Sequence, residues 1–191
     1  MVNFSTPIIL ASKSPRRQQL LRELGFEFII RTKETDESYP ASIAAMDVPE
    51  YLAKKKAMDL SDELKNEILI ASDTIVLFEN KILGKPQNEL EAFDMIKGMS
   101  GKTHQVITGV CLHSKNKIIT FSDTTEVRFH ELSDQEISYY IEHYRPFDKA
   151  GAYGIQEWIG MIGIEYIKGS YFNVMGLPTN KLYRELLSFH D

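Results

Sequence analysis

Residues 12–17, Ser-Lys-Ser-Pro-Arg-Arg, carry side chains suited to binding an anion. Arg16 and Arg17 fall in the first turn of a predicted helix, where the helix dipole disfavours each cation by roughly 0.3–1 kcal/mol. A bound anion would remove that cost, because the free backbone N–H groups and the hydroxyls of Ser12 and Ser14 would face it as well. We therefore expect phosphate at this turn. The alternative is two solvated arginines on an exposed helix end.

A carboxylate lies inside a strongly apolar segment. Residues 68–78 read Ile-Leu-Ile-Ala-Ser-Asp-Thr-Ile-Val-Leu-Phe, which predicts a central strand interrupted by polar residues at its middle. A carboxylate between such flanks is costly to bury without partners. Asp73 is therefore a candidate site residue, the alternative being a cap at a local bend. Asp123 stands in a second Ser-Asp-Thr sequence, but its neighbours are polar, so it is interpreted as a solvated strand position.

A lysine shares a helical row with two leucines. Leu52, Lys56 and Leu60 are spaced four residues apart in a helix that Pro49 is expected to open. Such a lysine either lies along the edge of the core with its ammonium in water or reaches into a cleft. The sequence leaves both alternatives open.

The cations and carboxylates together suit a polyphosphate with a divalent metal. Mg²⁺ takes oxygen ligands, often one or two carboxylates plus substrate phosphates, and loop 32–40 contains Glu34, Asp36 and Glu37. Loop 147–156 combines two glycines, a Lys-Asp pair and an amide, which indicates a backbone passing close to something. The candidate site residues are Ser12, Ser14, Arg16, Arg17, Glu37, Lys56, Asp73, Lys85, Lys149 and Gln156.

Composition and missing motifs exclude several other classes. The formal net charge of −5 argues against a general nucleic-acid binder. Cys111 is the only cysteine and is expected to be buried and inert, so an internal disulfide and a thiolate cluster are excluded. The sequence contains no P-loop, no dinucleotide-binding glycine motif and no zinc spacing. With no signal pattern or membrane-length apolar run, a cytoplasmic protein is expected.

Strand and helix patterns alternate along the chain, which indicates an α/β protein with a mixed sheet. Strands are expected at 8–11, 26–30, 68–78, 105–112, 118–121, 127–129 and 158–167, with a hairpin turn at 79–81. Helices are expected after Ser14, at Pro49, and after Asn88, Ser133 and Pro178. Expected inward-facing residues include Leu90, Phe93 and Ile96 in the third helix and Ile137, Tyr140, Ile141 and Tyr144 in the fourth.

Several motifs, in this order, resemble those of the Maf family of nucleotide pyrophosphatases. They are residues 12–17 with Leu20-Leu21, Lys56-Ala57, Ser72-Asp73-Thr74, Gly84-Lys85-Pro86, the run Asp148 to Gln156, and near the C-terminus Gly169-Ser170-Tyr171 and Gly176-Leu177-Pro178. The resemblance covers about Ile8 to Leu187. We treat residues 1–191 as one domain of this kind.

The resemblance implies a fold and an activity. The fold is an α/β arrangement related to inosine triphosphatases, with a mixed sheet flanked by helices and two lobes around a central cleft. The activity is hydrolysis of nucleoside triphosphates to monophosphate and pyrophosphate with a divalent metal, Mg²⁺ or Mn²⁺. In these terms Asp73 is the base or a metal ligand, and Glu37 helps to hold the metal. Phosphates are held by Arg16, Arg17, Lys56, Lys85 and Lys149 with the hydroxyls of Ser12 and Ser14.

Three positions indicate the branch that acts on dTTP and UTP. That branch has Pro-Arg-Arg, Asp-Thr and Gly-Ile-Gln, matched here at Arg16, Thr74 and Gln156, whereas the branch acting on N7-methylguanosine triphosphate has Pro-Tyr-Arg and Asp-Gln. Modified pyrimidine triphosphates are further candidate substrates. Glu157-Trp158 departs from the family pattern, which more often has Gly after the glutamine, and this bears on the shape of the base pocket.

The alternative to an enzyme is a nucleotide-binding regulator of cell division without turnover. The intact Asp73 and the full set of lysines argue against it. The expected partner is a nucleoside triphosphate, with neither nucleic acid nor membrane. The oligomeric state is left open, a homodimer being one alternative.

Overall fold

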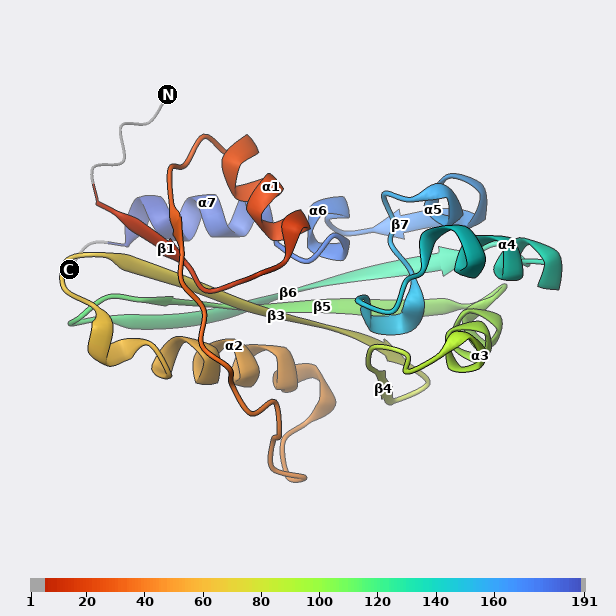
Figure 1. The fold of residues 1–191 in the computed structure, drawn as a ribbon, viewed down its shortest axis with the longest axis horizontal. Helices are drawn as coiled ribbons and strands as arrows, with labels where there is room; N and C mark the ends of the chain where they lie inside the picture. Colours follow the sequence, from red (N-terminus) through yellow and green to blue (C-terminus); the bar gives the residue numbers. More distant parts are fainter. Residues whose placement is uncertain (1–5, 190–191) are drawn as a thin grey trace. The chain divides into compact units, whose positions relative to one another are not determined.

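The computed structural model describes residues 6–189. Within this range the strands form a seven-stranded sheet in the order β2-β1-β3-β5-β6-β7, with β4 paired to β3. The sheet is mixed, because β1 pairs parallel with β2 and β3 while β3–β4 and β6–β7 are antiparallel. Helices flank the strands (Figure 1), so the expected α/β class with a mixed sheet is confirmed. None of the helices in the described part of the chain has the length and apolar character needed to cross a membrane.

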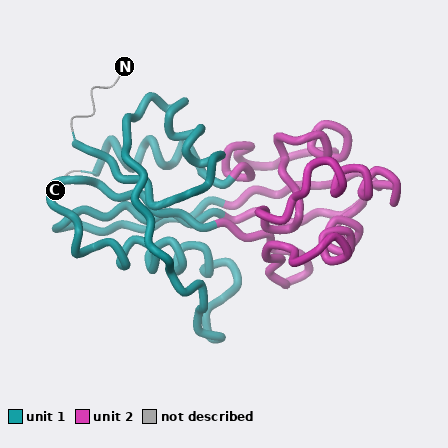
Figure 2. The backbone as a smooth tube through the Cα atoms, in the orientation of Figure 1, with its two compact units in different colours: residues 1–73, 108–123, 176–191 teal, residues 74–107, 124–175 magenta. Residues whose placement is uncertain are grey.

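The chain divides into two compact units (Figure 2). Unit 1 comprises residues 1–73, 108–123 and 176–191, and unit 2 comprises residues 74–107 and 124–175. The division falls inside β3 (Ile68–Phe78), β5 (Thr103–His113) and β6 (Ile118–Phe129). Asp73 is the last residue of unit 1 in β3, and Thr74 is the first of unit 2.

Unit 1 surrounds the N-terminal strands with helices. Its other elements are β1 (Ile8–Leu10), α1 (Pro15–Glu23), β2 (Ile29–Ile30), η1 (Ala45–Asp47), α2 (Val48–Met58), η2 (Ser61–Glu63) and α7 (Thr179–Ser188). Figure 1 shows α1 and α7 on one side of the unit's strands and α2 on the other.

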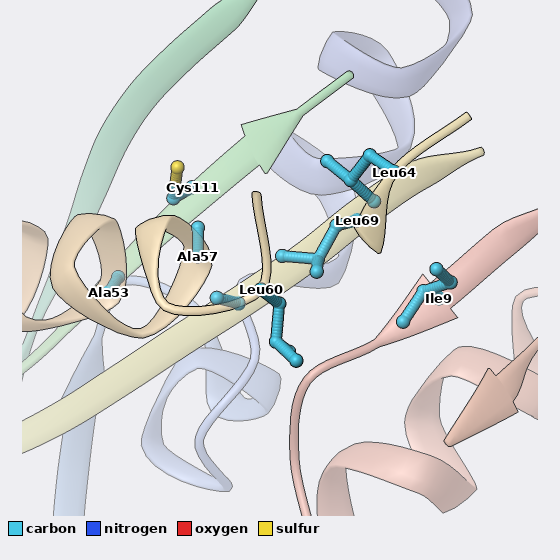
Figure 3. Close-up of a cluster of buried hydrophobic side chains, with 8 residues drawn as sticks. Ile9, Ala53, Ala57, Leu60, Leu64, Leu69 and Cys111 are labelled. Carbon is cyan, nitrogen blue, oxygen red and sulfur yellow. The ribbon is translucent and has the colours of Figure 1, made fainter. Parts of the chain in front are cut away.

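The buried cluster beneath α2 determines which side chains of β3 face that helix. Ala53 and Ala57 of α2 pack with Leu69 and Ala71 of β3, together with Ile9, Leu60, Leu64 and Cys111 (Figure 3). Successive strand residues point to opposite faces. Asp73 therefore shares the face of Leu69 and Ala71, toward α2. Cys111 is fully buried, as predicted, and burial raises its thiol pKa to about 12.

Unit 2 contains the remaining elements. They are β4 (Lys81–Leu83), α3 (Glu89–Met99), α4 (Asp134–Tyr144), η3 (Ala150–Ala152), α5 (Trp158–Gly163), β7 (Ile164–Lys168) and α6 (Tyr171–Val174). Helix α3 packs against α4 and η3, and α5 packs against α4 and β7. The expected hairpin is confirmed, because Glu79 and Asn80 have positive φ and join β3 to β4.

Several expected elements differ from the structure. Residues 158–167 were expected as strands, but Trp158–Gly163 is helical and only Ile164–Lys168 is a strand. Short apolar runs fit both periodicities, so the pattern does not separate them. Strand β3 continues through Asp73 without interruption, 118–129 is one strand, and β2 is only Ile29–Ile30.

Two expected inward-facing residues are exposed. Leu90 is 71% exposed because it lies about 1.7 turns from Ile96, off the buried row of Ala92, Ile96 and Met99. Tyr144, in the last turn of α4, is 38% exposed, whereas the other three expected residues of that helix are buried.

Candidate active site

The turn before α1 is built by its two serines. Ser14 is the N-cap, as predicted, and its Oγ accepts the backbone N–H of Arg17 at 3.5 Å, with Pro15 at the first helical position. The Oγ of Ser12 accepts the backbone N–H of Ser14 at 3.2 Å. Both hydroxyl oxygens therefore accept hydrogen bonds from backbone N–H groups of this turn. Arg16 is half-buried in the same first helical turn.

Arg17 ties this turn to two other parts of unit 1. Its Nε donates to the carbonyl of Gly176 and its Nη1 to the carbonyl of Ser72, both at 2.8 Å. Burial lowers the pKa of Arg17, Asp73 raises it, Arg16 lowers it and Glu37 raises it, in decreasing order of effect. The guanidinium therefore lies in the field of both candidate carboxylates, and it braces the strand residue that precedes Asp73.

Lys56 lies between two carboxylates. Its Nζ is 2.5 Å from Oδ1 of Asp73 and 2.8 Å from Oε1 of Glu37. The side chain of Asp73 is 13% exposed and that of Lys56 19%, so little water screens this pair. The strand register that turns Asp73 toward α2 explains the contact. The Lys56 ammonium is therefore paired with two carboxylates, and its reach into a cleft stays a prediction.

Only one of the three acids in loop 32–40 pairs with Lys56. Asp36 instead pairs with Lys55 at 3.1 Å and accepts a hydrogen bond from the Ser38 hydroxyl. These contacts, the hydroxyl first, lower the pKa of Asp36 to about 2. The structure thus places Glu37, the expected metal ligand of this loop, beside Asp73.

Asp73 and Glu37 form a donor set suited to a hard divalent cation. Both present carboxylate oxygens to one positive charge, that of the Lys56 ammonium. Within residues 6–189, no group of three or more His, Cys, Asp or Glu side chains could hold a metal ion by itself. A two-carboxylate set fits Mg²⁺, which commonly completes its shell with water and substrate phosphates.

The remaining candidate residues lie in unit 2, around loop 147–156. Lys149 is buried, and its Nζ is 2.7 Å from Oδ1 of Asp148 and 3.1 Å from Oε1 of Glu157. The buried ammonium is therefore paired with two carboxylates of unit 2. Lys85 is exposed directly after Gly84, whose carbonyl accepts the backbone N–H of Gly151 at 3.0 Å.

The glycine-rich loop packs closely against β3, as its composition indicated. Gly151 has φ +68°, and a Cβ there would lie 2.8 Å from Cγ2 of Val76. Thr74, half-buried, precedes Val76 by two residues and therefore shares its strand face. This face of β3 within unit 2 is thus the one that the loop covers.

Gln156 has a buried acceptor and a nearby carboxylate. Among the described residues, its Oε1 is buried without a hydrogen-bond partner. The neighbouring Glu157 is bound by Lys149 and by the Tyr140 hydroxyl, which donates to Oε2. Neither Glu157 nor Tyr140 was a candidate from the sequence. Tyr140 was expected only as an inward-facing residue of an amphipathic helix, and Glu157 was noted only as a departure from the family pattern.

The structure brings the candidates together in two groups. Unit 1 holds Ser12, Ser14, Arg16, Arg17, Glu37, Lys56 and Asp73; unit 2 holds Thr74, Lys85, Lys149 and Gln156. The first group has the cations and carboxylates for a metal-bound phosphate. The second has cations and an amide.

Comparison with known proteins gives a consistent result. A family profile described as Maf-like protein matches residues 7–189. A protein of Flavobacterium psychrophilum named dTTP/UTP pyrophosphatase is 51% identical over 96% of this chain and 95% of its own. Proteins with the same name from Flavobacterium johnsoniae and Bacteroides fragilis are 53% and 50% identical, each over 94% of this chain and 93% and 94% of their own.

A solved structure shares the fold at low sequence identity. The Ham1 protein of Staphylococcus aureus aligns with a TM-score of 0.54 and 14% identity, over 94% of this chain and 99% of its own. The expected similarity to the inosine triphosphatase fold is therefore confirmed.

Proposed function

The chain belongs to the family of Maf-like proteins, and from that premise we propose that it hydrolyses dTTP and UTP to the nucleoside monophosphate and pyrophosphate. The observation that carries the proposal is the contact of Lys56 with both Asp73 and Glu37, beside an arginine-rich helix start. Relatives that are about half identical and bear that activity as their name support the choice of substrates.

In the proposed reaction, water attacks the α-phosphorus. Its oxygen forms the new P–O bond, the anhydride bond to the β-phosphate breaks, and pyrophosphate leaves with that bond's electron pair. The Asp73 carboxylate, whose position the Lys56 ammonium fixes, orients the water and accepts its proton. A divalent cation, Mg²⁺ or Mn²⁺, held by Asp73 and Glu37 would supply charge neutralisation.

The cationic side chains bind the phosphates in this proposal. Arg16 and Lys56 neutralise charge that develops on the phosphate oxygens, and Arg17 holds the turn in place through the carbonyls of Ser72 and Gly176. Ser12 and Ser14 shape the same turn. In unit 2, Lys85 and Lys149 bind further phosphate oxygens.

Thr74 and Gln156 are the proposed base-recognition residues. A primary amide has one acceptor oxygen and a donor nitrogen. Uracil and thymine present N3–H and O4 side by side, which Gln156 matches through Oε1 and Nε2. The buried Oε1 of Gln156, without a partner in the described chain, supports this role.

We assign the whole chain to one functional domain in the cytoplasm, where its triphosphate substrates are found. The family profile, which spans segments of both units, supports the single domain.

The decisive experiment measures pyrophosphate release from a panel of triphosphates with Mg²⁺ or Mn²⁺ and with chelator. We expect turnover of dTTP and UTP above the purines, abolished by chelator. The change Asp73→Asn is expected to lower kcat by at least about a hundredfold, the usual contribution of a general base.

The chain contains a matched control for this change. Asp123 stands in an identical Ser-Asp-Thr sequence but in β6, among polar neighbours, and has no role in the proposed reaction, so we expect Asp123→Asn to keep wild-type turnover. Equal loss in both variants would remove Asp73 from the reaction. Folded protein that binds UTP without turnover would instead support a nucleotide-binding regulator.

A further inference from the structure

A glutamine can discriminate between pyrimidines only if its amide has a fixed orientation. Uracil and thymine donate at N3 and accept at O4, whereas cytosine accepts at N3 and donates at N4. Rotation of the Gln156 amide by 180° exchanges its donor and acceptor and would suit cytosine equally well. A neighbouring group must therefore set the orientation.

Glu157 is held firmly beside this amide. Its Oε1 receives the Lys149 ammonium at 3.1 Å, and its Oε2 accepts the Tyr140 hydroxyl. Tyr140 lies in α4, and Lys149 directly precedes η3. Two separate segments of unit 2 therefore fix the carboxylate. The Glu157 side chain is only 19% exposed. Its charge consequently acts on neighbours with little screening by water.

Gly154 shows how close the carboxylate and the amide lie. A Cβ at this position would be 2.8 Å from Cδ and 2.9 Å from Oε2 of Glu157, and 3.0 Å from Nε2 of Gln156. The amide nitrogen and the carboxylate therefore border the same small space, which only a glycine leaves open. The Gly154 backbone N–H also donates to the Tyr140 hydroxyl at 2.9 Å, which anchors the loop to the same network.

The charge of Glu157 distinguishes the two ends of the amide. An ionised carboxylate only accepts hydrogen bonds, so it attracts the Nε2 hydrogens and repels Oε1. In the structure Nε2 borders the same small space beside Gly154 as the Glu157 carboxylate does, and Oε1 is buried without a hydrogen-bond partner among the described residues.

We propose that Glu157, held by Lys149 and Tyr140, is a positioning residue that fixes the Gln156 amide so that Oε1 accepts the N3–H of uracil or thymine and cytosine is rejected. This inference rests on the proposed function of the chain and deepens it. It assigns a role to the position where the sequence departs from the family pattern.

The test compares Glu157→Gln with Asp148→Asn in hydrolysis of UTP and CTP. Both changes remove one carboxylate from Lys149 and keep the shape of the side chain, and Glu157 is the one that the close approach at Gly154 places beside the Gln156 amide. In Glu157→Gln we expect the UTP-to-CTP ratio of kcat/KM to fall by about tenfold, the effect of one mispaired buried hydrogen bond. In Asp148→Asn the ratio is expected to stay at the wild-type value.

A second variant and a binding measurement keep the test independent of turnover and folding. Tyr140→Phe removes the hydroxyl from Oε2 and is expected to lower the same ratio. In the Asp73→Asn background, the dissociation constants of UMP and CMP should converge when Glu157→Gln is added. Thermal unfolding checks that each variant is folded.

The outcomes separate this inference from the proposed function. If the wild-type protein hydrolyses UTP in preference to CTP and folded Glu157→Gln keeps the ratio, Glu157 does not position the amide. An equal loss for both nucleotides would assign Glu157 a purely structural role and also overturn the inference. A wild-type protein that hydrolyses no triphosphate would instead defeat the proposed function.

Discussion

At the scale of single residues, the Lys56 ammonium is paired with two carboxylates, those of Asp73 and Glu37. Its two ion pairs, at 2.5 and 2.8 Å, compensate the charges of Asp73 and Glu37. Removing it leaves the largely buried Asp73 without this partner, which costs more than loss of a surface pair.

The change Lys56→Met is therefore expected to destabilise the protein by about 1–3 kcal/mol, the cost of an unpaired buried polar group. Added Mg²⁺ should recover part of that loss, because a ligand that binds only the folded state stabilises it. Urea unfolding with and without Mg²⁺ measures both effects. The control is Lys55→Met, whose partner Asp36 is exposed and for which we expect a change of less than about 1 kcal/mol. If Mg²⁺ stabilised Asp73→Asn as much as it stabilised Lys56→Met, the carboxylate pair would not be its site.

At the scale of secondary-structure elements, the loop over β3 depends on a glycine. Gly151 has φ +68° and no room for a Cβ beside Val76. Gly151→Ala is expected to destabilise the protein by about 2–5 kcal/mol, since the left-handed conformation alone costs about 1–2 kcal/mol and overpacking adds about 1–3 kcal/mol. Urea unfolding measures the loss.

Two further variants separate the causes of that loss. Gly84→Ala, where a Cβ meets nothing within 4 Å, should change stability by less than about 1 kcal/mol. In a Val76→Ala background, Gly151→Ala should cost less free energy of unfolding than it does in the wild-type protein, because the steric part of its cost is removed. Strict additivity of the two changes would show that Val76 does not limit this position.

Elements with one dominant pattern were predictable from the sequence, and elements with two compatible patterns were not. The strand 68–78 was predicted at its observed bounds, because its length and apolar flanks admit little else. The segment 158–163 was misread because its short apolar run fits both a strand and a helix. A Cβ at Gly160 would lie 1.8 Å from the Ile155 carbonyl oxygen, a close backbone approach that the hydrophobic pattern does not reveal.

The candidate site was predictable where residue type alone indicates the chemistry. Cations are unfavourable in the first turn of a helix, and so is a carboxylate inside an apolar strand. Both features were therefore recognisable from the sequence. The link from Tyr140 to Glu157 joins a helix face to a loop seventeen residues away. A buried tyrosine on an apolar stripe looks the same whether or not its hydroxyl has a partner.

At the scale of the whole molecule, the two units contribute different chemistry to the proposed reaction. Unit 1 contains the residues proposed for water activation and metal binding, and unit 2 contains those proposed for base recognition. Unit 2 also buries a titratable residue, His104, whose ionisation would affect the stability of the fold.

His104 makes folding stability depend on pH. Its Nε2 is 2.7 Å from the Tyr153 hydroxyl, its ring packs against Phe129, and burial lowers its pKa from 6.5 to about 4. Between these values the unfolded chain binds more protons than the folded one, so stability falls as the pH drops. At about 1.4 kcal/mol per pKa unit, this residue contributes about 3 kcal/mol at pH 7 that is lost by about pH 4.

Chemical unfolding at a series of pH values tests this contribution. In His104→Gln, we expect a flatter decline of stability between pH 6.5 and 4 than in the wild-type protein, because the titrating group is gone. In His130→Gln, a change at an exposed histidine, the decline should match the wild type. An unchanged slope in His104→Gln would mean that the buried histidine is not the group whose protonation destabilises the fold, and that carboxylates alone cause the acid loss.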